Sequence, residues 1–408
     1  MKTEPKLPLL LFYASRQIGG GEAYFINLGL AAIRSGRRCI VVDYSGGYVI
    51  SRIPGAELIV YDDESGADFT GSCIAFMPIG GATFLGDKLR LNPNAKVLLV
   101  SIHQNHALEL GVWGWLLRRL SPALAGFIWP IIEPCRFRVV RRFFQEICRL
   151  KGLAYCAPFQ RDFDEEYLGC TLHAQVVPIP LPGKLASPAE VIGQGRAIVW
   201  VSRFAKEKAA IIEEVIAGLK SARAKHKLIL IGEGPEYQRI KRVAAEAGLE
   251  FEMPGVVAGN DLVCYLRQHA LLCVGVGTAA AEMAAAGLPT LVAGLPGAYA
   301  GRYAWFHQSR PGDTIVTSAN CHASLTLSEA LKELESMNRR QVVAAACADA
   351  AISRHDIDAS WKQLSGSLEE SQLEARQVIS LLRMKQQPFS FIRKLKHKLR
   401  KSASSVAA

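Results

Sequence analysis

The sequence lacks the segments that carry a chain into or across a membrane. Its first residues include two prolines and a glutamate beside only a short apolar run, so we predict no signal peptide and assign residues 9–13 to a first strand. The most apolar long region, residues 107–132, is interrupted by Arg118, Arg119 and Pro122. A spanning helix needs about 20 uninterrupted apolar residues. We therefore expect a cytoplasmic protein.

Metal and dinucleotide motifs are also missing. The ten cysteines include no Cys-x-x-Cys pair and no Cys/His cluster at metal-ligand spacing. Single cysteines such as Cys73, Cys264 and Cys347 are predicted as small core residues of a reducing compartment. No Gly-x-Gly-x-x-Gly fingerprint of a dinucleotide site occurs. We predict neither a metal site nor a bound cofactor.

The positive charge is concentrated at one end of the chain. Eight Lys or Arg and no acid lie between residues 383 and 401, so without that stretch the net charge falls from +11 to +3. Half of the 408 residues are hydrophobic and only 21% are charged. A chain of this length and composition is expected to fold into two globular domains followed by a basic tail.

Strand-like apolar runs alternate with helix-like segments along the chain. The strand at residues 9–13 is followed by glycines, a helix at 22–34 and a strand at 39–42, and such a crossover makes the two strands parallel. A second alternating set follows a segment rich in proline and glycine. The pattern predicts an α/β protein with two doubly wound, Rossmann-like domains that face a central cleft. The predicted boundaries are residues 1–180 for the first domain, 181–195 for the linker, 196–365 for the second domain, 366–387 for a C-terminal helix (around residues 367–382) and 388–408 for the tail.

One stretch, VGVGTAAAEMAAAGLP at residues 274–289, combines a strand end, glycines and a helix start. The first N–H groups of a helix have no partner inside the helix, and Gly275 and Gly277 let an anion approach them. Glu282 lies one turn into the helix that begins near Thr278, where it can accept hydrogen bonds from hydroxyl groups. A phosphate beside a diol is typical of a nucleotide, whereas the simpler interpretation is a buried alanine helix. The predicted nucleotide-binding residues are Gly277, Thr278, Ala279 and Glu282.

Polar residues follow several other predicted strands, at the edge where a parallel sheet binds ligands. Arg203 and Lys208 suit a diphosphate, because arginine binds two oxygens at once and lysine provides a point charge. His103 follows a strand of the first set, with His106 as an alternative for the same place. Solvated surface charge and a structural histidine are the simpler interpretations. The loop between the first strand and helix carries Gly19, Gly20 and Gly21.

These segments resemble the signature of family 4-type retaining glycosyltransferases, which have the GT-B fold. Glu282 and the following Gly-Leu-Pro match the end of a motif that has two glutamates separated by seven residues, but Val274 stands in place of the first glutamate. Arg203 and Lys208 match an Arg-Phe and Glu-Lys pattern, with serine and alanine at its two glycine positions. The glycines before Glu22 resemble the family's Gly-Gly-x-Glu loop.

The resemblance implies an enzyme that moves a hexose from a UDP- or GDP-linked sugar to a glycan or glycolipid, with retention and without a metal, in polysaccharide or lipopolysaccharide assembly. It implies that Arg203 and Lys208 hold the donor diphosphate, that His103 faces the transferred sugar, and that the glycine loop approaches the donor phosphate and the acceptor. Two alternatives remain: a sugar-nucleotide 2-epimerase of the same fold, and a catalytically silent sugar-nucleotide-binding partner. Val274 favours the silent partner, because valine cannot bind sugar hydroxyls.

The tail has the pattern of a basic amphipathic helix. Apolar residues from Phe389 to Leu399 recur at three- and four-residue steps among lysines and arginines. Such a helix lies at the surface of an anionic membrane, and Trp113, Trp115 and the arginines at 136–142 are expected to add a second contact. This predicts a peripheral place on the inner face of the plasma membrane and no nucleic-acid partner, with a solvated tail as the alternative.

Overall fold

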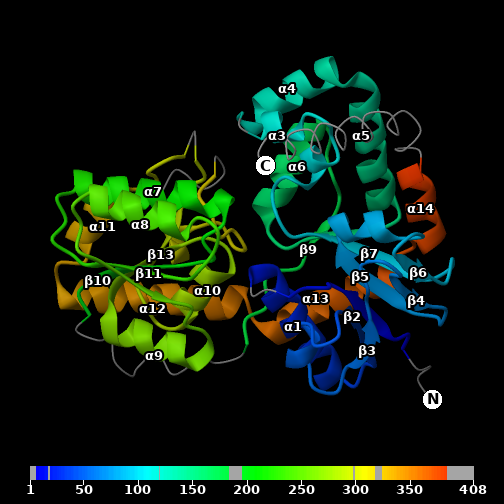
Figure 1. Ribbon diagram of the computed structural model, residues 1–408, viewed down its shortest axis with the longest axis horizontal. Helices are drawn as coiled ribbons and strands as arrows, with labels where there is room; N and C mark the ends of the chain where they lie inside the picture. Colours follow the sequence, from blue (N-terminus) through cyan, green and yellow to red (C-terminus); the bar gives the residue numbers. More distant parts are fainter. Residues whose placement is uncertain are drawn as a thin grey trace, which may run out of the picture.

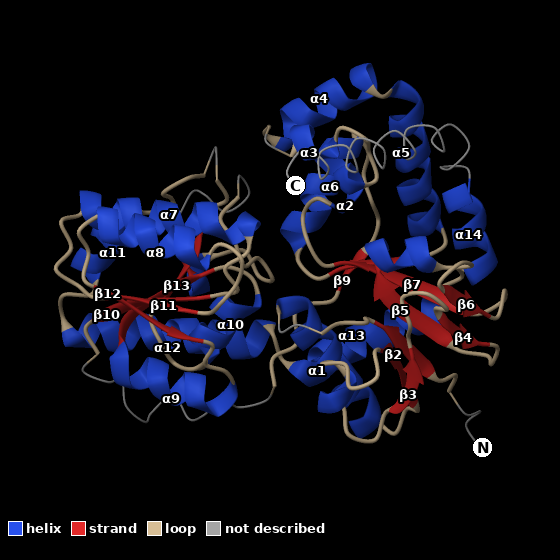
Figure 2. Ribbon diagram, in the orientation of Figure 1, coloured by secondary structure: helices blue, strands red, loops and turns tan. Residues whose placement is uncertain are grey.

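Two α/β halves lie side by side in the computed structural model, each built on a sheet with helices on both faces (Figure 1, Figure 2). The structure describes residues 6–16, 19–118, 120–182, 195–296, 299–317 and 324–383. Among these residues, no helix combines the length and hydrophobicity needed to cross a bilayer. The predicted fold class, two doubly wound Rossmann-like domains, is confirmed.

The first sheet has seven parallel strands in the order β3-β2-β1-β5-β7-β8-β9. Its central strand reads Leu-Leu-Leu-Phe and is buried throughout, as expected for a parallel strand covered on both faces. The strand order reverses between β1 and β5, which places a ligand-binding crevice at their carboxyl ends. The strands are β1 (Leu9–Phe12), β2 (Cys39–Asp43), β3 (Glu57–Val60), β5 (Ile74–Pro78), β7 (Lys96–Ser101), β8 (Leu153–Tyr155) and β9 (Gln175–Val176), and β4 (Ala67–Phe69) pairs separately with β6 (Leu89–Leu91).

The second sheet has six strands in the order β12-β11-β10-β13-β14-β15, of which only the edge strand β15 is antiparallel. The order reverses between β10 and β13, so the loops after these two strands meet at a second crevice. The strands are β10 (Ala197–Val201), β11 (Leu228–Ile231), β12 (Phe251–Gly255), β13 (Ala270–Gly275), β14 (Thr290–Ala293) and β15 (Tyr303–Trp305).

Helices connect the strands and cover both sheets. Those of the first half are α1 (Gly20–Arg34), α2 (His106–Glu109), α3 (Gly114–Leu117), α4 (Pro122–Ile132), α5 (Pro134–Arg149) and α6 (Pro158–Leu168). Those of the second half are α7 (Lys206–Ser221), α8 (Tyr237–Glu246), α9 (Gly259–His269), α10 (Thr278–Ala285), α11 (Leu327–Glu333) and α12 (Met337–Arg354).

The C-terminal part of the chain differs from the prediction. The single helix expected around residues 367–382 is two helices, α13 (Ile357–Glu370) and α14 (Ala375–Arg383). The residues between these two helices are not helical. Leu373 is buried there, and its carbonyl accepts the N–H of Val97 at 2.8 Å. Helix α13 packs on α1 of the first half, although residues 357–365 were assigned to the second domain.

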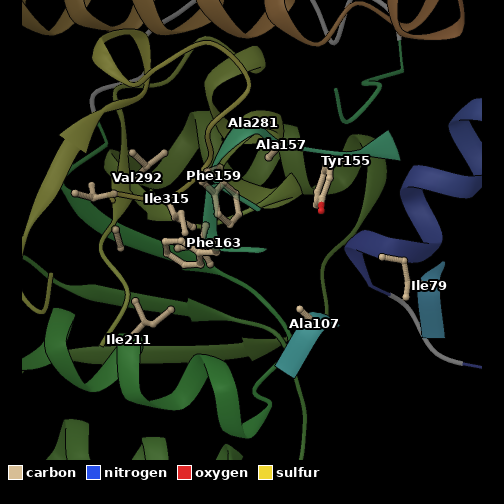
Figure 3. Close-up of a cluster of buried hydrophobic side chains, with 14 of the residues drawn as sticks. Ile79, Ala107, Tyr155, Ala157, Phe159, Phe163, Ile211, Ala281, Val292 and Ile315 are labelled. Atoms are coloured by element: carbon tan, nitrogen blue, oxygen red, sulfur yellow. The ribbon is translucent and has the colours of Figure 1, made fainter. Parts of the chain in front are cut away.

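The chain passes between the halves twice, once after residue 181 and once near residue 355. These two connecting segments are hydrogen-bonded to each other. Leu181 donates its N–H to the carbonyl of His355 at 2.9 Å, and His355 Nδ1 lies 2.8 Å from the carbonyl of Ile179. Most of the predicted linker, and the whole predicted tail, fall outside the described residues. Buried side chains of both halves also form one cluster, in which Phe159 and Phe163 of α6 lie beside Ile315 (Figure 3).

Candidate functional site

The start of α1 brings the predicted glycine loop to the other half of the molecule. A β-carbon at position 20 would lie 2.7 Å from Thr278 Oγ1, so a larger residue there would displace the Thr278 side chain. A β-carbon at position 19 would lie 3.8 Å from a guanidinium nitrogen of Arg203. Glu22, in the first turn, is buried and accepts a hydrogen bond from Ser15 Oγ at 2.7 Å. The glycine loop therefore lies directly against the second half.

The start of α10 has the geometry of an anion site. Gly277 has φ +65° and ψ −144°, a conformation that favours glycine, and its N–H donates to the carbonyl of Thr314 at 3.1 Å. Within the described part of the chain, no acceptor lies on the N–H groups of Thr278 and Ala279. These two donors, at the positive end of the helix dipole, point out of the strand–helix turn as the sequence predicted.

Glu282 is a carboxylate without a partner. It lies one turn into α10, and among the described residues no donor or cation contacts it. Burial raises its pKa to about 7. The side chain is half-buried, and its oxygens are not among the buried polar atoms that lack a partner, so the carboxyl group is open to water and to a ligand hydroxyl.

Arg203 and Lys208 follow β10, at the point where the strand order of the second sheet reverses. Arg203 leaves the sheet two residues after Val201, and Lys208 lies in the first turn of α7. Burial lowers the pKa of the Lys208 ammonium; the Glu207 carboxylate opposes this shift, and the Arg203 guanidinium adds to it. The charges of Arg203 and Lys208 therefore influence each other. Two cations this close can bind the same diphosphate.

The two predicted histidines stack on each other at the end of β7. Their ring centroids are 3.6 Å apart, and His106 Nε2 accepts the N–H of Ile102 at 3.3 Å. His106 is buried, whereas His103 is half-buried and faces the second half, because the charges of Glu207 and Lys208 both act on it. Burial lowers the pKa of His103 to about 4. At neutral pH His103 is uncharged and can donate or accept a hydrogen bond.

The sequence-predicted residues thus come together from four elements. Gly20 lies against Thr278, Gly19 lies near Arg203, and the charge of Lys208 acts on His103. Sequence reasoning did not single out Tyr13, which follows β1: burial and the Glu22 carboxylate raise the pKa of its phenol, and the Arg203 guanidinium opposes this. Its place after a central strand was the signal that could have identified it.

A clamp between the halves was also missed. The buried Asp313 carboxylate accepts the N–H of Phe159 at 2.9 Å and pairs with Arg310 at 2.9 Å, while Arg310 pairs with Asp162 at 2.7 Å. The next residue, Thr314, accepts the N–H of Gly277. The clamp therefore fixes the start of α10 relative to α6. Nothing in the sequence marks these residues as neighbours.

Val274, the position assigned to the family's first glutamate, lies in the core. It is in β13 between Trp200 of β10 and Leu291 of β14, with 0% of its surface exposed. Only Val276 and Gly277 separate β13 from α10. A residue that contacts a sugar must face the ligand, and this position does not. At this position the chain therefore offers the ligand no side chain in place of the family's glutamate.

One group of described residues could hold a metal ion, namely His103, His106 and Glu109, whose ligand atoms lie within 4.8 Å of one another. This group was not recognised as a metal site in the sequence, where no metal was predicted. A cavity of about 520 Å³ lies elsewhere, beside α6. Its lining includes Phe159, Asp162 and Glu166 but none of the predicted site residues.

Comparison with known proteins identifies the fold. No family model matches the chain, and no curated protein matches it. Solved glycosyltransferase structures do match. HepE (Alr3699) of Anabaena, in complex with UDP and glucose, has a TM-score of 0.57 at 15% identity, with 89% of this chain and 100% of that chain covered.

Two further structures agree. TarM of S. aureus, solved with alpha-GlcNAc-glycerol and UDP, has a TM-score of 0.57 at 8% identity, over 89% of this chain and 100% of its own. The lipopolysaccharide outer core galactosyltransferase WaaB has a TM-score of 0.51 at 10% identity, over 88% and 98%. At such identities the likeness concerns the fold, which is the GT-B arrangement of two Rossmann-like domains.

Proposed function

We propose that the protein is a glycosyltransferase that moves a hexose from a UDP- or GDP-linked sugar to a glycan or glycolipid acceptor. The observation that carries this proposal is the convergence of Arg203, Lys208 and the free N–H groups of α10 beside the unpartnered Glu282. Cations and helix donors suit a diphosphate, and the carboxylate suits the ribose diol. The GT-B neighbours that bind UDP support the same assignment.

The proposed reaction retains the anomeric configuration and needs no metal. The bond between the anomeric carbon and the diphosphate breaks, the acceptor oxygen bonds to that carbon, and the acceptor proton passes to a diphosphate oxygen. Arg203, Lys208 and the N–H groups of Thr278 and Ala279 stabilise the charge that develops on the departing diphosphate. His103, neutral at pH 7, orients a hydroxyl group of the transferred sugar.

The deciding experiment is incubation with a panel of UDP- and GDP-sugars and glycan acceptors, with release of free nucleotide and transfer of sugar as readouts. Turnover should persist in excess EDTA. If EDTA abolishes turnover and added divalent cation restores it, a metal would instead be assigned to the group of His103, His106 and Glu109. Binding without release would favour the catalytically silent partner, which the position of Val274 supports. Conversion of the sugar nucleotide without transfer would favour the epimerase.

Replacing Glu282 by glutamine is expected to weaken binding of the parent nucleoside diphosphate by about 1–3 kcal/mol, the scale of a charge-assisted hydrogen bond. Ribose hydroxyls bind the ionised carboxylate best, and the pKa of Glu282 is about 7. The wild-type affinity should therefore rise between about pH 6 and pH 8, and more steeply than that of the variant. Calorimetry at both pH values tests this. If the wild type and the Glu282→Gln variant bind the nucleotide equally well at both pH values, Glu282 does not contact the nucleotide.

We also propose that the C-terminal tail binds an anionic membrane, near a lipid-linked acceptor. Removal of residues 388–408 takes away six Lys or Arg, each contributing about 1 kcal/mol near an anionic surface. The truncated protein should no longer sediment with anionic vesicles, while nucleotide binding is kept. Sedimentation equal to that of the full chain, or sedimentation that salt does not reduce, would contradict the role of the tail.

A further inference from the structure

Helix α4 presents an apolar surface to solvent. Leu124, Phe127 and Ile131 lie on one helical face, and 46%, 70% and 65% of their surfaces are exposed. The opposite face is buried, through Ala125 and Trp129. A helix that is apolar on all sides belongs either inside a protein or in contact with lipid. We define the α4 patch as the exposed apolar residues of α3 and α4 and the turn before α3, namely Trp113, Leu116, Leu124, Phe127, Ile131 and Ile132.

The patch is held in place by a buried carboxylate. Glu133, at the junction of α4 and α5, accepts Trp129 Nε1–H at 2.9 Å and the N–H groups of Val112 and Trp113 at 2.9 and 3.3 Å. These bonds join the turn before α3 to the end of α4. The exposed side chains therefore belong to a fixed surface.

Arginines lie on the α3 and α5 sides of the patch, whereas α6, which packs on α4, carries Glu165 and the exposed Glu166. Residues 110–144 contain six arginines, and their one acid is the buried Glu133. Arg118 precedes α4, and Arg138 and Arg142 follow it on α5; all three are exposed. Helix α14, the last described helix, packs against α5, which follows the patch in the chain (Figure 1).

We infer that the α4 patch docks into the interface of an anionic lipid bilayer and acts together with the tail. Exposed Phe, Leu, Ile and Trp beside the exposed arginines of α3 and α5 match that interface in polarity and, on those sides, in charge. A second copy of the chain fits less well, because two such faces would bring their arginines together. Stable attachment needs two signals, and the patch supplies the apolar one. The inference extends the proposed membrane contact of the tail but does not depend on transferase activity.

The position of the patch relates it to the site. The chain passes from His103 through α2 to Trp113 at the edge of the patch. In Figure 1, α4 lies at the outer edge of the first half, away from the second sheet. A protein docked through this face would keep the second half free of the lipid, while the segment that carries His103 lies next to it.

The test uses the full chain and vesicles of phosphatidylcholine alone or mixed with phosphatidylglycerol, without nucleotide or acceptor. The double variant Phe127→Ser, Ile131→Ser should bind mixed vesicles at least about a hundredfold more weakly, tenfold or more for each side chain removed from the interface. Arg138→Gln and Arg142→Gln should each cost about fivefold. The matched control is Val256→Ser, Val342→Ser, which removes side chains that are 53% and 50% exposed on the second half and should change nothing.

Unchanged vesicle binding by the Phe127→Ser, Ile131→Ser protein would overturn the inference and leave the tail as the only contact. A dimer in light scattering that this variant dissociates, with vesicle binding intact, would assign the patch to a second copy and overturn it as well. Nucleotide affinity and the thermal midpoint should match those of the wild type, since all the substituted side chains are exposed. A fall in both nucleotide affinity and thermal midpoint would therefore indicate misfolding. The milder single variant Phe127→Ser would then decide by the same vesicle assay.

Discussion

Turnover is expected to fall about 10²- to 10³-fold when either Arg203 or Lys208 is replaced by alanine, while the affinity for the sugar nucleotide falls much less. Negative charge grows on the diphosphate as the glycosidic bond breaks, so each cation interacts more strongly with the transition state than with the bound donor. Loss of such a group lowers kcat and kcat/KM together. Both cations lie after β10, where the strand order reverses.

The measurement is steady-state release of nucleotide, compared with calorimetry on the same variants. Arg239→Ala is a suitable control, because Arg239 pairs with Glu213 on the surface of α7 and α8, outside the site. Arg203→Lys should recover part of the turnover, since it restores the charge but not the two-point contact. Wild-type turnover in both alanine variants would show that these cations are ordinary surface charges.

Introducing the family's glutamate, through Val274→Glu, is expected to destabilise the second half by about 3–5 kcal/mol rather than to raise activity. Position 274 is fully buried between Trp200 and Leu291. The new carboxyl group would lie in the sheet without a partner and would be held neutral at a large cost.

Thermal or urea unfolding measures this effect. The control is Val256→Glu, at a position that is 53% exposed, where a change of no more than about 0.5 kcal/mol is expected. A stable Val274→Glu protein with increased turnover would place position 274 at the ligand and contradict the buried location. Such a result would also restore the family's full motif as the basis of catalysis.

The parts of the site that the sequence predicted are those set by local pattern. A strand, two glycines and a helix start define Gly277 and Thr278 within a few residues, and the strand-end rule identifies Arg203. The contact of Gly20 with Thr278 joins residues from different halves, and no local pattern contains it.

Two other findings depend on tertiary structure. The predicted strand at residues 271–274 is confirmed by β13, but the motif match assigned Val274 to the family's sugar-binding glutamate, and it could not show that this side chain is buried in the sheet. The exposure of Phe127 depends on which face of α4 packs against α6, and an all-apolar helix gives no periodic signal to decide it. The break between α13 and α14 at residues 371–374 was not predicted for a similar reason, because its hydrogen-bond partners are the distant residues Val97 and Leu150.

Under the proposed function, the meeting of α1 and α10 at Gly20 and Thr278 would couple donor binding to the closeness of the two halves. Each helix start carries a partial positive charge of about half an elementary unit, so the two ends repel each other when nothing lies between them. A diphosphate at this point reverses the sign of the interaction and attracts both. The donor then binds more tightly to the closed arrangement than to an open one, and by linkage whatever favours closure strengthens donor binding by the same factor. Departure of the diphosphate would remove that attraction, and the bonds of Asp313 and Arg310 to α6 would then be left to hold the two halves together.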